Sequence, residues 1–464
     1  MLLPLSMFSQ STYFEKVFGS AGIDISRSVK QINSGSIFVF GNSDSLGSND
    51  LSLTKLDANG NRLWTKYYGT GNTENGFFLN TTNDGNLVFT GETETASNNL
   101  DVVIGKVDTT GAVLWYTTYA SPVNETGKYI EQTTDGGYII AGAQNDALGL
   151  YDILVLKLDA NGNYQWHQPL GRSDNEYGSM IHEIPAGYIL TADTRSYGAG
   201  GYDVILYDLD TAGNEIWSQT YGDSLQNGCQ GLLITSDGKY LSYGETEIAP
   251  SSAFDFFLEK IDTSGTVIWR YTYGGSGSDA IFSVKEDVDG GFICTGYSNS
   301  YNGFAPLDLV IFKVDAAGTF QWKQTYGGSG IDIGYEIIRS INNNGFIITG
   351  KTVTDGNDEF YLLKLDNNGL LSGISSMEEN SVMFDVFPNP AAEAFFVHYR
   401  LSGNADDSRL QLYNMLGEII YENKLDSPED TVKIDVSALG PGIYFCVVVK
   451  NGEKILSKKI VIEN

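Results

Sequence analysis

A single motif recurs along most of this 464-residue chain and restricts the folds open to it. Its first copy reads LDANGNRLWTKYYG, where Asp57 precedes Gly60 by three residues and Trp64 by seven. Six copies keep this spacing, and successive tryptophans stand 51 to 53 residues apart. They are the only tryptophans in the chain: Trp64, Trp115, Trp166, Trp217, Trp269 and Trp322. A fixed period of this length indicates stacked copies of one structural unit.

Each period has room for four short strands, which we call a, b, c and d. In the sixth copy they read DAIFSVKE, GGFICTG, DLVIFKVD and TFQWKQTYG. Strand c is nearly apolar on both faces, so it has to be covered on both sides. A four-stranded sheet packed between two similar sheets meets this need, and the repeat therefore predicts a β-propeller.

The number of strands predicts how the ring closes. Seven a-b-c units follow one another, but only six are followed by a d strand with a tryptophan. Residues 13–19, YFEKVFG, supply the missing strand, with Phe14 at the tryptophan position. Pairing this strand with the last unit joins the chain ends and removes open sheet edges. We predict an all-β, monomeric chain with a seven-bladed β-propeller over residues 11–370.

The Asp-x-x-Gly turn of the motif offers closely spaced oxygens that could hold calcium. A calcium loop of the EF-hand type needs ligands at alternate positions and a bidentate Glu downstream, and none of the seven turns has this set. We interpret the turn as the c–d hairpin, in which the Asp caps its own turn and the Gly takes a positive φ. No cofactor is expected, and calcium at these turns is the alternative.

The tryptophan falls on the outermost strand of the predicted blade, so we expect it to cover the neighbouring blade rather than to bind a ligand. The pattern resembles the tryptophan-docking motif of propeller quinoproteins, which also combines Asp, Gly and Trp. In this chain the Asp lies one residue closer, the number of blades differs, and no quinone-binding residues are found. The resemblance implies packing between blades and no cofactor.

The loops that join b to c vary most in sequence, and chain direction places them with the d–a loops on one face, the top face. Variable loops on a rigid scaffold are the usual place for binding. The candidate ligand residues on this face are aromatic: Tyr151, Tyr197, Tyr202, Phe254, Tyr301 and Phe304. We expect a non-enzymatic protein that binds a glycan or a protein there.

The alternative is an enzyme that acts on polysaccharide, with its site at the top of the central channel. An acidic residue opens every strand c: Asp50, Asp101, Asp152, Asp203, Asp255, Asp308 and Glu359. Glycosidase carboxyls lie within about 10 Å of each other. Because these belong to different blades, we interpret them as loop anchors. His167, His182 and His398 fall at unrelated repeat positions, so neither a catalytic triad nor a metal site is predicted.

Composition excludes two classes of partner. The formal net charge of -30 repels nucleic acid and anionic membranes. No stretch approaches the roughly 18 apolar residues that a membrane-spanning helix needs.

Residues 1–10, MLLPLSMFSQ, resemble the remnant of a signal peptide without its basic start, so we expect a start codon upstream. Cys229, Cys294 and Cys446 lack disulfide or zinc spacing and are expected to be buried free thiols.

After a linker over residues 371–382, the segment 383–464 has alternating strands of its own. About seven short strands in this length predict a small immunoglobulin-like β-sandwich. Three stretches are distinctive: FPNPA at 387–391, LYNMLGEII at 412–420, and LGPGIYFCVVVKNGEKILSKKIVI at 439–462. Through these stretches the segment resembles the C-terminal sorting domain of the type IX secretion (Por) system of Bacteroidetes-like bacteria.

The sorting-domain motif comprises Pro388, Asn389, Pro390, Gly417, Gly442, Tyr444 and Lys459. Family members commonly have Asp and a basic residue where this chain has Asn414 and Glu418. The resemblance implies export by the signal peptide, passage through the outer membrane by the type IX machinery, removal of this domain, and a secreted or surface-attached product. An ordinary immunoglobulin-like binding module is the alternative.

Overall fold

The computed structural model divides into two compact units, Met1–Gly373 and Ile374–Asn464. The described residues are 13–20, 22–69, 71–95, 99–146, 148–198, 200–248, 253–275, 277–301, 306–354, 356–371, 383–387, 394–401, 405–415, 417–450 and 453–462. Strands and turns make up these residues, apart from one turn of 3-10 helix, η1 (Ile341–Asn343).

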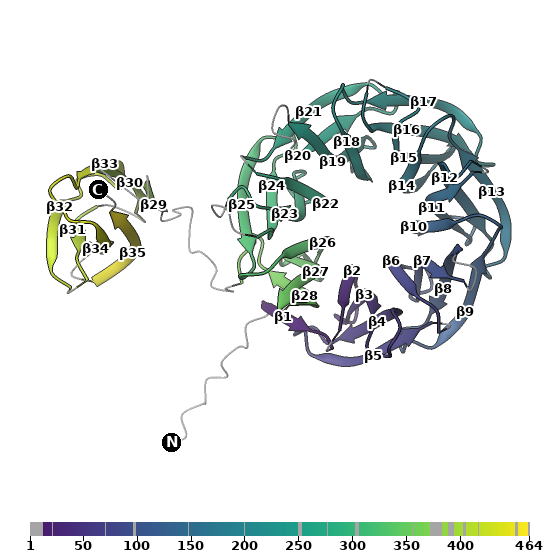
Figure 1. Cartoon of the computed structure of the whole chain (residues 1–464), viewed down its shortest axis with the longest axis horizontal. Helices are drawn as coiled ribbons and strands as arrows, with labels where there is room; N and C mark the ends of the chain where they lie inside the picture. The colour runs from purple at the N-terminus through teal and green to yellow at the C-terminus, as the bar shows by residue number, and fades with distance from the viewer. Residues whose placement is uncertain are drawn as a thin grey trace, which may run out of the picture. The chain divides into compact units, whose positions relative to one another are not determined.

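The first unit is a ring of seven four-stranded antiparallel sheets, or blades (Figure 1). Blade 1 contains β2 (Asp24–Gln31), β3 (Ile37–Ser43), β4 (Asp50–Leu56) and β5 (Arg62–Tyr68). Blade 2 contains β6 (Glu74–Thr81), β7 (Leu87–Glu94), β8 (Leu100–Val107) and β9 (Val113–Tyr119). Blade 3 contains β10 (Glu125–Gln132), β11 (Tyr138–Asn145), β12 (Tyr151–Leu158) and β13 (Tyr164–Leu170).

The same order continues around the ring, with the first strand of each blade innermost. Blade 4 contains β14 (Glu176–Ile184), β15 (Gly187–Thr194), β16 (Asp203–Asp210) and β17 (Glu215–Tyr221). Blade 5 contains β18 (Asn227–Ile234), β19 (Tyr240–Ile248), β20 (Ala253–Ile261) and β21 (Val267–Tyr273). Blade 6 contains β22 (Asp279–Glu286), β23 (Phe292–Ser298), β24 (Asp308–Val314) and β25 (Phe320–Tyr326).

The last blade joins the two ends of the ring. Blade 7 contains β26 (Asp332–Arg339), β27 (Phe346–Thr354), β28 (Asn357–Leu365) and, as its outer strand, β1 (Phe14–Phe18). β1 runs antiparallel to β28, with Phe14 opposite Lys364 and Phe18 opposite Phe360. The predicted seven-bladed propeller, closed by an N-terminal strand, is therefore confirmed.

The propeller core lies between successive blades. All seven residues of β24 are buried, as expected for a strand covered on both faces. One apolar cluster combines Leu309 and Ile311 of blade 6 with Ile337 and Ile348 of blade 7. Each blade therefore depends on its neighbours for its core, so the ring is stable only as a whole.

Each tryptophan faces the c–d turn of the next blade. A Cβ atom added to Gly111, in the turn of blade 2, would lie 2.8 Å from Cη2 of Trp64 in blade 1. Phe14 faces Gly60 in the same way, in the turn of blade 1. The Tyr68 hydroxyl adds a hydrogen bond by donating to the Gly111 carbonyl at 2.9 Å. The outer strand of one blade thus docks on a turn of the next, and the turn glycine leaves room for the aromatic side chain.

The turn itself is stabilised by its aspartate. Asp57 Oδ1 accepts the backbone N–H groups of Asn59 and Asn61, each at 2.9 Å. Gly60 has a φ of 76°, a conformation that favours glycine. Within the described ranges, no group of three or more His, Cys, Asp or Glu side chains is placed to hold a metal ion.

The second unit is a small β-sandwich. One sheet has the order β29 (Met383–Phe387), β30 (Ala394–Arg400), β33 (Glu429–Asp435). The other has the order β32 (Ile419–Lys424), β31 (Ser408–Tyr413), β34 (Gly442–Lys450), β35 (Glu453–Ile462). Phe395 and Val397 of the first sheet share one buried cluster with Leu410, Leu412 and Cys446 of the second.

Two further sequence expectations can be compared with the structure. The three cysteines are free and buried, as expected. In the part of the chain that the structure describes, no helix is long and apolar enough to cross a membrane.

Candidate functional site

The innermost strand of every blade contains a β-bulge. In β10 the pairing with β11 shifts between Gly127 and Tyr129, which leaves Lys128 without a partner in the ladder. The same shift occurs at the fourth residue of each innermost strand. We call these seven residues the bulge ring: Arg27, Phe77, Lys128, Ser179, Gln230, Phe282 and Tyr335. Bulges re-aim side chains and often lie next to functional sites.

A glycine inside strand b makes room for the bulge. A Cβ atom added to Gly142 of β11 would lie 1.8 Å from the carbonyl oxygen of Thr126 in β10. Six blades have glycine at this position, and blade 4 has Ala192. Because glycine inside a strand marks a bulge or a close backbone approach, the recurring b-strand ending in Gly was the sequence signal for this ring.

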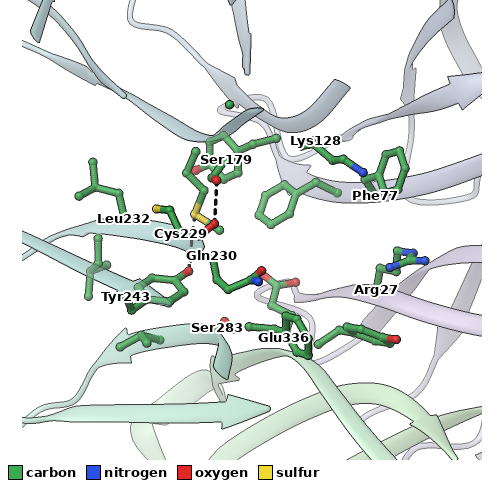
Figure 2. A pocket seen from close by; sticks show the side chains of 18 of the residues that line it. Arg27, Phe77, Lys128, Ser179, Cys229, Gln230, Leu232, Tyr243, Ser283 and Glu336 are labelled. Atoms are coloured by element: carbon green, nitrogen blue, oxygen red, sulfur yellow. Dashed lines mark hydrogen bonds between the residues drawn. The ribbon is translucent and has the colours of Figure 1, made fainter. Parts of the chain in front are cut away.

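All seven residues of the bulge ring line one cavity at the centre of the propeller, with a volume of about 390 Å³. Figure 2 shows Arg27, Phe77 and Lys128 grouped together, with Ser179 and Gln230 in another part of the cavity wall. The Ser179 hydroxyl donates a hydrogen bond to the Cys229 carbonyl at 2.9 Å. The ring thus combines cations, aromatic rings and neutral hydrogen-bonding groups around one space, as ligand pockets commonly do.

Two cations of the ring lie against aromatic faces. The Lys128 ammonium lies 3.6 Å from the centre of the Phe77 ring, and the Arg27 guanidinium lies 5.6 Å from the same ring. Arg27 is also 5.3 Å from the centre of the Tyr335 ring. Burial lowers the pKa of Lys128; Glu92 opposes this shift and the positive charge of Arg27 adds to it. Two positive charges beside one aromatic ring favour an anion near them.

The acidic side chains deeper along the innermost strands already have partners. Glu336 accepts the Lys30 ammonium at 2.6 Å and also the Ser28 hydroxyl at 2.7 Å. Glu131 pairs with His182 at 2.6 Å. These contacts satisfy the carboxylates and leave the positive charges of the bulge ring uncompensated by them.

Three tyrosines form a row on the top face, which we call the aromatic row: Tyr151, Tyr177 and Tyr202. The ring centres of Tyr151 and Tyr177 are 5.1 Å apart, and those of Tyr177 and Tyr202 are 6.1 Å apart. The Arg195 guanidinium lies 5.1 Å from the Tyr202 ring. The row therefore crosses blades 3 and 4 without a break.

A second cavity of about 400 Å³ borders the aromatic row. It is lined by Tyr177, Asp193, Tyr202, Gln226, Gly228, Glu245 and Phe254. Tyr177 and Asp193 also line the central cavity, so the two spaces share a wall. A ligand on the row could therefore extend toward the bulge ring.

The pKa values of two carboxyl groups that line the second cavity are raised. Burial, with a smaller contribution from Glu245, raises the pKa of Asp193 to about 7, although the Cys229 N–H donates to Asp193 Oδ1 at 2.5 Å. Burial also raises the pKa of Glu245. Groups perturbed in this way are frequent in functional sites.

The six aromatic residues predicted for the top face lie in different surroundings. Tyr202 and Phe254 line the second cavity, and Tyr151 belongs to the row. Tyr197 instead packs against the core of blade 4, with Arg172 at 4.5 Å over its ring. Tyr301 lies in blade 6 under Lys323, at 3.5 Å. Phe304 lies outside the described residues. Tyr177 was missed because it lies on an inner strand, as the second residue of β14, rather than in a loop.

The acidic residues that open strand c are not isolated in separate blades. A Cβ atom on Gly69 would lie 2.1 Å from Asp50 Oδ1 of blade 1 and 2.9 Å from Glu74 Oε2 of blade 2. Five other junctions repeat this arrangement, with Asn227 as the partner of Asp203, and the remaining junction has Ala120 in place of the glycine. Burial, followed by the charge of Asp101, raises the pKa of Glu125 to about 7. The expected loop anchors thus form pairs across the blade junctions.

The sorting-domain residues can be placed in part. Gly417 has a φ of 80° in the turn between β31 and β32, and the Tyr444 hydroxyl donates to the Gly440 carbonyl at 2.9 Å. Gly442 begins β34, and Lys459 lies on β35 opposite Phe445. Pro388, Asn389 and Pro390 lie outside the described residues.

The two residues that depart from the sorting-domain pattern bind each other. Asn414 Nδ2 donates to Glu418 Oε2 at 2.7 Å, and the Glu418 N–H donates to Asn414 Oδ1 at 3.0 Å. The departure therefore still closes the turn.

Comparison with known families identifies the second unit. The family described as "Secretion system C-terminal sorting domain" matches residues 385–463. The chain is therefore a secreted or cell-surface protein handled by type IX secretion, with a seven-bladed propeller ahead of its sorting domain.

Other relatives are more distant. The chain is 24% identical over 238 residues to "Ulvan lyase NLR42" of Nonlabens ulvanivorans, a match that covers 48% of this chain and 38% of the lyase. Among solved structures, puromycin hydrolase matches 82% of this chain and 60% of its own at 11% identity and a TM-score of 0.48. Sqt1 from Chaetomium thermophilum matches 73% of this chain and 82% of its own at 12% identity and a TM-score of 0.42.

Proposed function

We propose that the propeller is a non-enzymatic carbohydrate-binding module, displayed on the cell surface or secreted, and that a glycan binds along the aromatic row. The observation that carries this proposal is the row itself, in which Tyr151, Tyr177 and Tyr202 follow each other at 5.1 and 6.1 Å beside a cavity of about 400 Å³. A chain of sugars can occupy such an open row and reach the cavity.

The chemistry of the row suits a saccharide. Sugar rings have apolar C–H faces that pack against aromatic rings, and the phenol groups remain available for hydrogen bonds. Asp193, Gln226 and Glu245 offer acceptors for sugar hydroxyls at the edge of the row. A few polar groups in a mostly apolar pocket give a ligand its orientation.

The proposal is tested by titrating glycans selected from an array into the full chain. Replacing Tyr177 with Ala removes the central ring of the row and one wall of both cavities, so we expect the affinity to fall about ten-fold or more. Tyr301→Ala is the matched control, because Tyr301 lies on another blade outside the row. Wild-type affinity in a Tyr151→Ala, Tyr177→Ala, Tyr202→Ala variant would contradict the proposal.

A second candidate function is cleavage of a polysaccharide. Asp193 and Glu245 line the same cavity, and the pKa of Asp193 is raised to about 7, a value suited to proton transfer near neutral pH. The partial similarity to a lyase that acts on ulvan also favours this candidate. In this reading the aromatic row holds the chain and the two carboxyl groups act on it.

The second candidate is tested by incubating the full chain with a panel of polysaccharides that includes ulvan and measuring the chain length of the products. If it holds, Asp193→Asn should abolish cleavage, and the glycan affinity should fall far less because the amide keeps an oxygen that accepts from a sugar hydroxyl. Binding without any shortening of the polysaccharide in the wild-type protein would exclude it in favour of the binding module.

A further inference from the structure

The bulge ring contains two cations of the cavity, the half-buried Arg27 and the more exposed Lys128, that the protein does not neutralise. Arg27 and Lys128 donate no hydrogen bond and form no ion pair to any residue that the structure describes, and Arg27 Nε is buried without a partner. The chain has 58 acidic and 28 basic residues, so acidic partners are plentiful. Leaving the buried Arg27 Nε without a partner beside a second positive charge costs free energy unless a ligand compensates it.

Other lysines at buried positions of the propeller show what the protein does when the role is structural. Lys30 pairs with Glu336 at 2.6 Å, Lys106 with Asp84 at 2.7 Å, and Lys157 with Asp135 at 2.9 Å. Where no carboxylate is near, Lys364 donates to the Ala58 carbonyl at 3.1 Å. Lys128 has neither kind of partner, and it faces Phe77 and the cavity instead.

We propose that Arg27 and Lys128 bind an anionic group of a saccharide, a carboxylate or a sulfate ester, inside the bulge ring. The guanidinium matches either group through paired hydrogen bonds, and the ammonium, which lies over the same Phe77 ring, adds a point charge. Phe77 and Tyr335 give the attached sugar ring apolar faces to pack on. The inference rests on the proposed function, because the sugar chain reaches the ring from the aromatic row.

The opposite part of the ring is compatible with this assignment. Ser179 and Gln230 are neutral, so they can bind sugar hydroxyls without repelling the anion. Two acidic side chains line the cavity: Glu336 is held by Lys30, Ser28 and the Val29 N–H, and Asp193 accepts from the Cys229 N–H. An anion at the cationic side therefore meets no uncompensated carboxylate from the bulge ring.

The test uses the full chain and three simple probes: glucuronate, inorganic sulfate and glucose, each titrated at low ionic strength. We expect glucuronate or sulfate to bind and glucose to bind more weakly, with the carboxylate and sulfate arms distinguishing the two chemistries. A variant with Arg27→Gln and Lys128→Gln should lose about ten-fold or more in affinity for the preferred anion. Affinity should also fall with added salt.

Lys323→Gln is the matched control, because Lys323 also lies over an aromatic ring but outside the bulge ring. Removal of unpaired cations should leave the melting temperature of the ligand-free protein unchanged or higher, which separates loss of the site from loss of the fold. Absence of anion binding by the wild-type protein, or equal binding by the double variant, would overturn the inference.

The outcomes also separate this inference from the proposed function. If the double variant binds a glycan with carboxylate or sulfate groups as tightly as the wild-type protein does, the anion site is wrong and the glycan-binding function stands. If no glycan binds but the double variant loses the simple anion, the anion site stands and the proposed function falls.

Discussion

The outermost and innermost strands of each blade belong to the same repeat, but the outermost strand is uniform at its docking position and the innermost strand varies at its bulge position. At the docking position six blades have Trp and the seventh has Phe14. At the bulge position the seven blades have six different residue types. The docking side chain meets the same turn geometry at every junction, whereas the bulge side chains meet one another and the cavity. Positions that keep one kind of residue in every repeat therefore indicate a structural role. Positions that vary between repeats indicate where a ligand would be recognised.

The largest effect is expected at the docking position. Trp64→Ala removes a large ring from the junction between blades 1 and 2, and we expect it to lower the free energy of unfolding by about 3 kcal/mol. Urea unfolding measures this loss. Trp64→Phe is the control, because blade 7 uses Phe14 at this position, and it should cost clearly less. If Trp64→Ala left the stability unchanged and abolished glycan binding, the docking position would have a role in binding rather than in the fold.

The second-largest loss of stability is expected in the turn on which the Trp64 side chain packs. Gly111→Ala introduces a Cβ atom 2.8 Å from Trp64 at a φ of 76°, and we expect a loss of about 2 kcal/mol. Gly85→Ala is the matched control: its φ is 79°, and a Cβ atom there would meet nothing within 4 Å. The difference between the two variants, read from urea midpoints, measures the docking contact alone. Equal losses would show that backbone strain explains both.

The paired carboxyls at the blade junctions should make stability depend on pH. The pKa of Glu125 is raised from 4.5 to about 7, so the folded protein binds more protons than the unfolded chain between these values. The free energy of unfolding should therefore decrease as pH rises from about 5 to about 8. Glu125→Gln should flatten this profile and stabilise the protein by about 1 kcal/mol at the alkaline end. A flat wild-type profile of melting temperature against pH would contradict this reading.

The smallest effect on stability is expected in the bulge ring. Gln230 lines the cavity, and its side chain makes no hydrogen bond to the described residues. Gln230→Ala should change the free energy of unfolding by less than about 0.5 kcal/mol, measured alongside Trp64→Ala. A loss similar to that of the docking variants would mean that the ring also supports the fold.

Much of the fold could be predicted from the sequence, because a propeller repeats the same sequence pattern in every blade. The tryptophan spacing, the doubly apolar c strands and Phe14 near the start together predicted seven blades and their closure. The sorting domain could be predicted from local motifs such as the one over residues 439–462, which contains Tyr444. These features are local in sequence or periodic, so one chain contains enough copies to reveal them.

The candidate site was predicted only in part. Tyr151, Tyr202 and Phe254 stand in variable loops or at strand ends and were found for that reason. Tyr177 and Lys128 lie on inner strands whose residues showed no recurring pair. The bulge changes which of these residues point into the channel, and its only mark in the sequence is a glycine on the neighbouring strand.

The sequence alone therefore determined the architecture, the number of blades and the route of export, because each of these depends on patterns within one repeat or one motif. Only the tertiary structure brought Arg27, Phe77 and Lys128 together, since they come from three blades about 50 residues apart and converge when the ring closes. The same closure placed Glu125 beside Asp101. Contacts across blades depend on the geometry of the whole ring, and no single repeat contains that information.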